Sequence, residues 1–253
     1  MEKITDCISY NGEKELFEIR YNILKDYVDE FIVVEFDKTF SGKPKKQLFT
    51  QHWDKVKYFW NDESIYNKYM DMANSSPNTK GAEHWKREFM QKESIKDCLT
   101  HLKDNDLVFI GDCDEIWNPE TDWKSFGGSP FKLNLRVYTY YLNNESSERF
   151  WGTLYCSYSL VKKNCINYLR TNTEKTKFNC GWHFTSMHHQ LGQKLTDSYT
   201  EESYATKEVM DNLQDNIKSN RDFLGRDFTY RVDESEWPQY LKDNRQMYLH
   251  LLK

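Results

Sequence analysis

Asp112 and Asp114 stand one residue apart, directly after the apolar run 107–110. Two carboxylates at this range repel each other, so a positive group should share their site. A divalent cation that also coordinates phosphate oxygens meets this need, and as a Lewis acid it would stabilise a phosphate leaving group. We therefore predict that Asp112 and Asp114 are ligands of a divalent cation, and that Asp112 also contacts the phosphate-bearing substrate. A solvated turn after a strand is the structural alternative.

The segment 181–184, Gly-Trp-His-Phe, places His183 within an aromatic strand. If this strand ends at the same sheet edge as the two aspartates, His183 would supply a third metal ligand. A purely structural histidine is the alternative. His188 and His189 follow in what we expect to be a loop.

Several charged residues fall within the apolar stripes of expected helices. Arg20 lies among the apolar positions of one helix, and Glu88 and Lys92 project into the apolar arc of another. Such charges must be paired or serve a ligand, and Glu88 and Lys92 are four residues apart and able to pair. Arg87 and Gln91, also four apart, could reach a phosphate or a ribose. Salt bridges at the edge of the core are the alternative for each charge.

The elements that must position these residues follow from the hydrophobic pattern. Strands and helices alternate in the N-terminal part, and the short apolar runs suit strands covered on both faces. This order indicates an α/β doubly wound domain, in which ligands bind at the carboxyl ends of the strands. The expected elements are a strand at 3–10, a helix at 13–28, strands at 31–34 and 56–60, a break at 74–81, a helix at 82–102 and a strand at 107–110.

The second half of the chain has a different pattern. Residues 131–162 are rich in Tyr, Phe and Val with partial alternation, which indicates further strands or a hairpin. A strand is expected at 178–184 and a helix at 202–223, before a charged and aromatic tail. A boundary near residue 190 could separate a C-terminal subdomain, and we treat 1–253 as one domain.

Composition excludes several classes of protein. The net charge of −5 argues against a duplex nucleic-acid binder, which usually carries a basic field. We find no apolar stretch long enough to span a bilayer and no signal peptide at the N-terminus. The six cysteines are scattered without a CxxC pair, so they read as reduced thiols. We therefore expect a cytoplasmic chain with no membrane span.

Aromatic residues are abundant, with 17 Tyr, 15 Phe and 8 Trp. Most must belong to the core. Carbohydrate sites also favour flat rings, because the C–H faces of a pyranose stack on them while its hydroxyls meet polar neighbours.

A set of short motifs in a fixed order covers most of the chain. This set of motifs, in this order, resembles the pattern of glycosyltransferase family 17. The motifs are Asp6-Cys7, Glu18-Ile19-Arg20, Ile32-Val33-Val34-Glu35, Thr39-Phe40-Ser41-Gly42-Lys43-Pro44, Arg87-Glu88, Asp112-Cys113-Asp114-Glu115-Ile116, Tyr140-Tyr141-Leu142-Asn143, Trp151-Gly152-Thr153 and Gly181-Trp182-His183-Phe184.

The resemblance implies a GT-A type fold, a Rossmann-like mixed sheet with flanking helices and a small helical C-terminal extension. It also implies a UDP-sugar donor, UDP-N-acetylglucosamine in the known members, a glycan acceptor and inversion at the anomeric carbon. Residues 1–117 would form the nucleotide-sugar half, and residues 118–253 the acceptor half with the extension. Mn²⁺ or Mg²⁺ would sit at Asp112 and Asp114. Glu35, Arg20, Lys43, Arg87 and Gln91 would join Asp112 in binding the donor.

The chain departs from the family pattern in two places. Residues 186–189, Ser-Met-His-His, replace a Gly-rich stretch, and Glu201 falls where relatives often have a histidine. Glu201 could coordinate the metal or act as a base. The glycoprotein-modifying members are also membrane-anchored, so the N-glycan acceptor need not carry over.

The expected reaction is a single in-line displacement by an acceptor hydroxyl, which needs a general base within hydrogen-bonding distance. Glu115 is the first candidate, because it adjoins the metal motif without having to bind metal, and His183 is the second. A structural contact to a backbone amide is the alternative for Glu115. A metal-dependent sugar nucleotidyltransferase would use similar carboxylates but release pyrophosphate, and it would need a phosphate loop that we do not find. A non-catalytic carbohydrate-binding relative is the remaining alternative.

Overall fold

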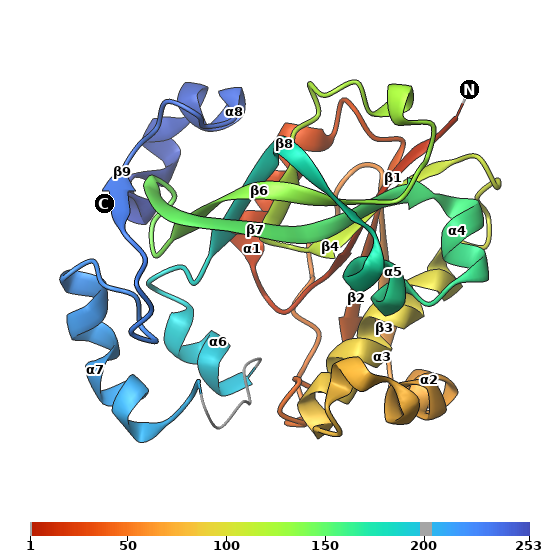
Figure 1. Cartoon of the computed structure of the whole chain (residues 1–253), viewed down its shortest axis with the longest axis horizontal. Helices are drawn as coiled ribbons and strands as arrows, with labels where there is room; N and C mark the ends of the chain where they lie inside the picture. Colours follow the sequence, from red (N-terminus) through yellow and green to blue (C-terminus); the bar gives the residue numbers. More distant parts are fainter. Residues whose placement is uncertain (1, 198–203) are drawn as a thin grey trace.

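The computed structural model describes residues 2–197 and 204–253, and a mixed β-sheet runs through its centre (Figure 1). The strand order is β3-β2-β1-β4-β7-β6-β8-β5, and β9 pairs with β7. The strands are β1 (Ile4–Ser9), β2 (Glu30–Phe36), β3 (Val56–Asn61), β4 (Leu107–Asp112), β5 (Glu115–Trp117), β6 (Phe131–Thr139), β7 (Asn144–Ser157), β8 (Glu174–Thr185) and β9 (Tyr230–Val232).

The N-terminal half of the sheet is parallel, with β1 between β2 and β4. Every residue of β2 is buried, as expected for a parallel strand covered on both faces. The register places Ser9, the last residue of β1, opposite Asp112, the last residue of β4. The carboxyl ends of two neighbouring strands therefore meet where the acidic turn begins.

The second half of the sheet is antiparallel around β7, which pairs with both β4 and β6. Strand β8 continues the sheet parallel to β6 and carries the short strand β5 antiparallel at its edge. Their register sets Glu115 opposite His183. The expected mixed sheet is therefore present, with a doubly wound N-terminal part, and its antiparallel pair β5–β8 brings His183 to the acidic turn.

Helices cover both faces of the sheet, because successive strand residues alternate between two apolar cores. One core contains Ile8 and Phe109 and packs under α1 and α8, and the other contains Ile32 and Ile110 and packs under α2 to α5. No helix in the described ranges is both long and apolar enough to cross a membrane. The helices are α1 (Lys14–Leu24), α2 (Glu63–Ser75), α3 (Glu83–Cys98), α4 (Tyr158–Lys163), α5 (Ile166–Asn172), α6 (Leu191–Asp197), α7 (Lys207–Lys218) and α8 (Gln239–Asp243), with 3-10 turns at Pro77–Thr79, Trp123–Phe126 and Arg245–Leu251.

Helices α6 and α7 form the expected C-terminal helical extension, at the lower left of Figure 1. They share a small apolar core with Tyr140, built from Leu191, Leu195, Leu213 and Ile217. The mixed α/β sheet with flanking helices is therefore confirmed together with its extension.

Most predicted elements are present with shifted ends. The first helix ends at Leu24, four residues before its predicted end, and α3 spans Glu83–Cys98 within the predicted 82–102. Helix α2 was not predicted at all. It is largely exposed, and its start is set by the Asp62 side chain, which accepts a hydrogen bond from the backbone N–H of Ser64.

Gly181 controls how closely β5 and β8 approach. A Cβ atom at this position would lie 2.2 Å from the carbonyl oxygen of Ile116. Because this contact is with backbone, Gly181→Ala should push β5 away from β8 and disturb the pairing of Glu115 with His183.

We expect Gly181→Ala to lower the free energy of unfolding by at least about 2 kcal/mol in urea denaturation. Gly192→Ala is the matched control, because a Cβ there meets no atom within 4 Å and the residue lies in α6. Its unfolding free energy should be unchanged or raised by up to about 1 kcal/mol. Equal effects of the two substitutions would contradict the close approach.

Candidate functional site

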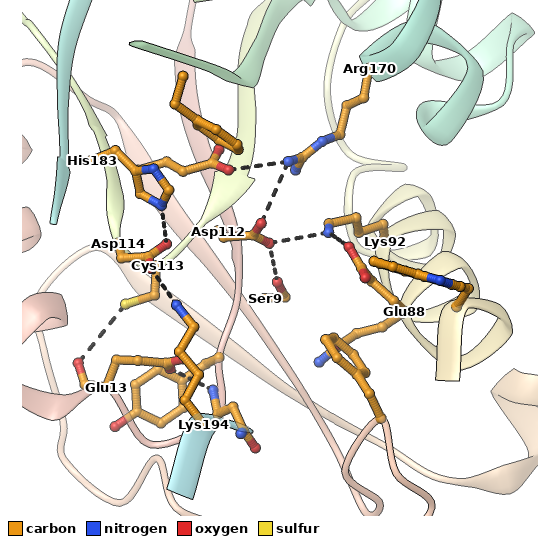
Figure 2. A pocket seen from close by; sticks show the side chains of 17 residues that line it. Ser9, Glu13, Glu88, Lys92, Asp112, Cys113, Asp114, Arg170, His183 and Lys194 are labelled. Atoms are coloured by element: carbon orange, nitrogen blue, oxygen red, sulfur yellow. Dashed lines mark hydrogen bonds and ion pairs between the residues drawn. The ribbon is translucent and has the colours of Figure 1, made fainter. Parts of the chain in front are cut away.

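A cavity of about 270 Å³ opens at the carboxyl edge of the parallel strands, between the acidic turn, α3, α5, β8 and α6. Figure 2 shows the acidic turn at its centre, with cationic side chains pointing in from the surrounding elements. We call it the acidic cavity. Its charged and hydroxyl lining consists of Ser9, Tyr10, Glu13, Glu88, Lys92, Asp112, Asp114, Glu115, Arg170, His183 and Lys194.

The Asp112 carboxylate is held by three side chains from three elements. Ser9 Oγ donates to Oδ1 at 3.0 Å, Lys92 Nζ lies 3.4 Å from Oδ1, and Arg170 Nη2 lies 3.5 Å from Oδ2. Burial acts to raise the pKa of Asp112, but the two cations outweigh it and hold that pKa well below its usual range. Asp112 is therefore ionised at neutral pH.

Asp114 faces a different pair of cations on the opposite side of the turn. Lys194 Nζ donates to Oδ2 at 2.9 Å, and His183 Nε2 lies 3.5 Å from Oδ1. Burial opposes ionisation, yet Lys194 and His183 keep the pKa of Asp114 far below its ordinary value. Burial acts to lower the pKa of His183, but the negative charge of Asp114 outweighs burial, so the pKa of His183 is raised above its ordinary value. The four cations thus divide between the two aspartates.

Glu115 is enclosed below the turn. Its Oε2 accepts from Thr153 Oγ1 at 3.0 Å, its Oε1 lies 3.3 Å from Arg170 Nη2, and the side chain is fully buried. A Cβ on Gly152 would lie 2.4 Å from Oε1, so only glycine leaves room for this carboxylate. Burial raises the pKa of Glu115 against the opposing charge of Arg170. Glu115, the predicted base, is therefore enclosed by protein groups and pairs with Arg170.

Arg20 lies beneath the turn and is also fully buried. It forms a bidentate pair with Asp6, with both N···O distances 2.6 Å. Its Nη1 also donates to the carbonyl oxygens of Asp112 at 3.2 Å and Glu115 at 2.5 Å. The prediction that Arg20 contacts the sugar-nucleotide donor is corrected, because its N–H groups already donate hydrogen bonds to protein groups that hold the acidic turn.

The prediction that Glu35 binds the sugar-nucleotide donor is corrected for the same reason. The buried carboxylate accepts from the backbone N–H groups of Leu48 at 3.0 Å and Phe49 at 3.1 Å, and from Tyr58 Oη at 2.9 Å, and it pairs with Lys45 at 3.1 Å. It therefore fixes the loop after β2 and does not face a ligand.

A second cavity of about 640 Å³ adjoins the acidic cavity, and we call it the lysine cavity. The two share Asn11, Glu13 and Lys194 in their walls. Lys43, a predicted donor residue, lines the lysine cavity and pairs with Asp197 at 3.1 Å. The remaining lining residues are Gly12, Thr39, Pro44, Lys45, Leu48, Gln190 and Asp197.

The two predicted residues on α3 differ in position. Gln91 lines the acidic cavity. Arg87 lies behind the wall, where its Nη1 donates to the carbonyl oxygen of Phe40 at 2.8 Å, and Phe40 itself lines the acidic cavity. The predicted pairing of Glu88 with Lys92 is confirmed, and this pair lies in the acidic cavity. Glu201 lies outside the described residues.

Four charged or hydroxyl residues of the site, besides Tyr10, were not predicted from the sequence. Ser9 could have been found, because it ends the strand that must lie beside the acidic turn. Glu13, Arg170 and Lys194 carried no usable signal. Arg170 and Lys194 come from α5 and α6, which follow the antiparallel strands, and no spacing in the sequence relates them to Asp112.

The fit of a divalent cation can be judged from the donor atoms. No group of three His, Cys, Asp or Glu side chains is gathered for a metal anywhere in residues 2–197 and 204–253. Asp114 Oδ1 and His183 Nε2 approach each other as one possible pair of ligands. Mg²⁺ commonly binds through one or two carboxylates, with substrate phosphates and water completing its shell. The site therefore fits a cation that arrives with a phosphate-bearing ligand.

Comparison with known families agrees with this architecture. The family model described as glycosyltransferase family 17 matches residues 1–197, which include the parallel strands, the acidic turn and His183. The match places the chain among the glycosyltransferases. It belongs to glycosyltransferase family 17.

Individual relatives match only in part. The β-1,4-mannosyl-glycoprotein 4-β-N-acetylglucosaminyltransferases of Homo sapiens and Rattus norvegicus are 25% identical over 146 residues, which cover 54% of this chain and 27% of each relative. The chain thus spans about a quarter of their length.

Two solved structures resemble the chain loosely. Mouse xyloside xylosyltransferase 1 has a TM-score of 0.34 and 7% identity over 67% of this chain and 74% of its own. The 4-diphosphocytidyl-2C-methyl-D-erythritol synthase of Anaerococcus prevotii has a TM-score of 0.34 and 11% identity over 78% and 83%. Likeness at this level carries no argument about the present chain.

The buried Arg20–Asp6 pair makes a stability prediction. Arg20→Met leaves Asp6 charged and unpaired, so the free energy of unfolding should fall by about 3–5 kcal/mol. The double variant Asp6→Leu with Arg20→Met removes both charges and should recover at least half of that loss in urea denaturation. If the double variant is no more stable than the single one, the cost does not come from the stranded charge.

Proposed function

We propose that the chain transfers a sugar from a UDP-sugar to a hydroxyl of a glycan acceptor, with inversion at the anomeric carbon and with Mn²⁺ or Mg²⁺ as cofactor. Family membership supports glycosyl transfer. The observation that carries the rest is the acidic turn at the carboxyl edge of the parallel strands, where two ionised aspartates and four cationic side chains surround one cavity.

The donor would lie across the lysine and acidic cavities. The nucleoside has room in the larger lysine cavity, and the diphosphate would lie where the two cavities meet, near Lys194. The transferred sugar would then occupy the acidic cavity beside Gln91 and Asp112. This arrangement uses both cavities and directs the sugar away from the nucleoside.

Asp114 would hold the divalent cation together with His183, whose imidazole would lose its proton when the cation binds, and Asp112 lies on the other side of the turn. When bound, the cation would supply Lewis-acid stabilisation of the departing diphosphate. The chain's own cations support the same charge. Of these, Lys194 stands where the diphosphate would lie, and it can turn from Asp114 to phosphate oxygens with little reorganisation.

The reaction would be one displacement. The acceptor oxygen forms a bond to the anomeric carbon as the bond from that carbon to the phosphate oxygen breaks. The acceptor's proton passes to a protein base, and the nucleoside diphosphate leaves. Attack from the face opposite the leaving group inverts the configuration.

The sugar itself is suggested by the relatives, which are named as N-acetylglucosaminyltransferases acting on β-mannosyl glycoproteins. We propose N-acetylglucosamine or a related hexose as the transferred sugar. Because the chain spans about a quarter of these relatives, the acceptor is proposed only as a glycan hydroxyl.

The donor site is tested by thermal unfolding with UDP, GDP, CMP and UDP-sugars, each with Mn²⁺ or with EDTA. A ligand at 100 times its Kd adds about 2.7 kcal/mol of stability, which is roughly 5–10 °C in Tm for a chain of this size. We expect this rise for UDP ligands with Mn²⁺ and its loss in Asp114→Asn. Asp104→Asn is the matched control, because Asp104 is exposed and pairs only with the exposed Lys162 among its ionic contacts in the described residues. No rise with any nucleotide would remove the proposed function.

The reaction class is tested by its products. Incubation with a UDP-sugar and a glycan should release UDP, and ¹H NMR of the new linkage should give the anomeric configuration opposite to that of the donor. Release of pyrophosphate would instead identify a nucleotidyltransferase. Retention of configuration would discard the single displacement, and sugar binding that needs neither metal nor nucleotide would favour a binding protein.

A further inference from the structure

A third cavity, of about 250 Å³, continues from the acidic cavity on the side away from the lysine cavity. It shares Trp85, Glu88, Lys92, Phe150 and Arg170 with the acidic cavity, and none of its lining residues belongs to the lysine cavity. The three cavities therefore form a row with the acidic cavity in the middle. We call the third one the aromatic cavity.

The lining of the aromatic cavity divides by charge. All of its charged residues, Glu88, Lys92 and Arg170, stand in the wall shared with the acidic cavity. Beyond that wall the lining is neutral, with aromatic rings and short polar side chains. These outer residues are Asn78, Thr79, Phe89, Trp151, Gly152, Asn167 and Thr171.

This lining suits a neutral sugar. Rings such as Trp85 and Trp151 can stack on the apolar face of a pyranose, while the side-chain oxygens of Asn167 and Thr171 can accept hydrogen bonds from its hydroxyls. None of the described residues that line the outer part of this cavity is charged, although Lys175 Nζ lies over the Trp151 ring, 4.5 Å from its centre. An uncharged glycan therefore fits better than a second phosphate-bearing ligand.

A base for the acceptor must stand where the acceptor meets the donor sugar. Among the described residues, Glu88 is the only carboxylate in the wall that the acidic and aromatic cavities share. Its side chain is 25% exposed, whereas that of Glu115 is fully buried between Thr153 and Arg170. Glu13 lines the acidic and lysine cavities and so lies on the donor side.

The surroundings of Glu88 also suit proton transfer. Lys92 donates to Oε1 of Glu88 and lies 3.4 Å from Asp112, so it orients the Glu88 carboxylate toward the middle of the site (Figure 2). Lys92 is nearly buried, with its side chain 6% exposed, and its position on the next turn of α3 keeps the pair together.

We propose that the aromatic cavity binds the acceptor glycan and that Glu88, not Glu115, is the base that accepts the proton of its attacking hydroxyl. This inference rests on the proposed function, because it places the acceptor on the face of the sugar opposite the diphosphate. The O–H bond of the acceptor breaks toward Glu88 as its oxygen bonds to the anomeric carbon, and UDP carries away the electron pair of the broken C–O bond. Glu88 then returns the proton to solvent.

Binding of the acceptor in the aromatic cavity is tested by ligand-observed saturation-transfer NMR in the presence of UDP and Mn²⁺. The probes are the methyl β-glycosides of mannose, glucose, galactose and N-acetylglucosamine. At least one should bind the wild type, and Trp151→Leu should weaken that binding at least tenfold while leaving the thermal shift with UDP unchanged. Tyr168→Leu is the control, because Tyr168 is 58% exposed on α5 and lines none of the three cavities. It should behave as the wild type.

The assignment of Glu88 as the base is tested by measuring transfer from the UDP-sugar to the glycoside that binds. Glu88→Gln should lower kcat by about 100-fold or more, the range expected for loss of a general base, without changing the UDP thermal shift. Glu88→Ala should regain part of its rate with added formate. Glu83→Gln, which changes a 62% exposed carboxylate on the same helix, should keep full activity.

The outcomes separate the two proposals. If the wild type shows no UDP-dependent shift, the proposed function fails. If UDP binds but no glycoside does, or if Trp151→Leu binds glycosides as the wild type does, the aromatic cavity is not the acceptor site. A kcat of Glu88→Gln within threefold of the wild type would overturn the assignment of the base.

Discussion

The guanidinium group of Arg20 joins three parts of the chain beneath the acidic cavity. It pairs with Asp6 on β1 and donates to the carbonyl oxygens of Asp112 and Glu115 on either side of the turn. Asp6 also accepts from the indole N–H of Trp117 on β5 at 2.9 Å. Burying two charges costs several kcal/mol unless their hydrogen-bonding groups are satisfied. Here the cost is offset by contacts to the turn, so the same pair also fixes the backbone that carries the carboxylates of the acidic turn.

The acidic turn then organises the charges above it. Asp112 engages Lys92 and Arg170, and Asp114 engages Lys194 and His183. Each cation comes from a different element, so a site of this shape exists only when both halves of the sheet are assembled. A diphosphate entering the cavity would exchange carboxylate partners for phosphate partners. Preorganised charges of this kind need little movement when negative charge develops on a leaving group.

The parallel half of the fold could be predicted from the sequence because its strands are short apolar runs buried on both faces. The acidic turn could be predicted because two aspartates follow such a run directly. His183 was predicted at the turn only on the condition that its strand ended at the same sheet edge, and the pairing of β5 with β8 meets that condition. Arg20 was recognised as a charge within an apolar stripe, but its protein partner was Asp6, which lies on a strand and carries no sign of pairing in the sequence. Arg170 and Lys194 could not be predicted, because the strand order β7-β6-β8-β5 in the second half of the sheet decides which helices reach the turn.

The same division of the sheet would separate the two substrates of the proposed reaction. The loops after β1 and β2 contribute most of the lysine cavity, whereas α3, β7 and α5 supply the aromatic cavity. Glu88 and Lys92 on α3 stand between them, in line with the acidic turn. An inverting displacement requires its two reactants on opposite faces of one carbon, and cavities arranged in a row on either side of the acidic turn meet that requirement. Under the proposed function, changes at Trp151 on β7 and Thr171 on α5 would alter the acceptor site. Thr153 and Arg170, on the same two elements, must stay because they hold the acidic turn.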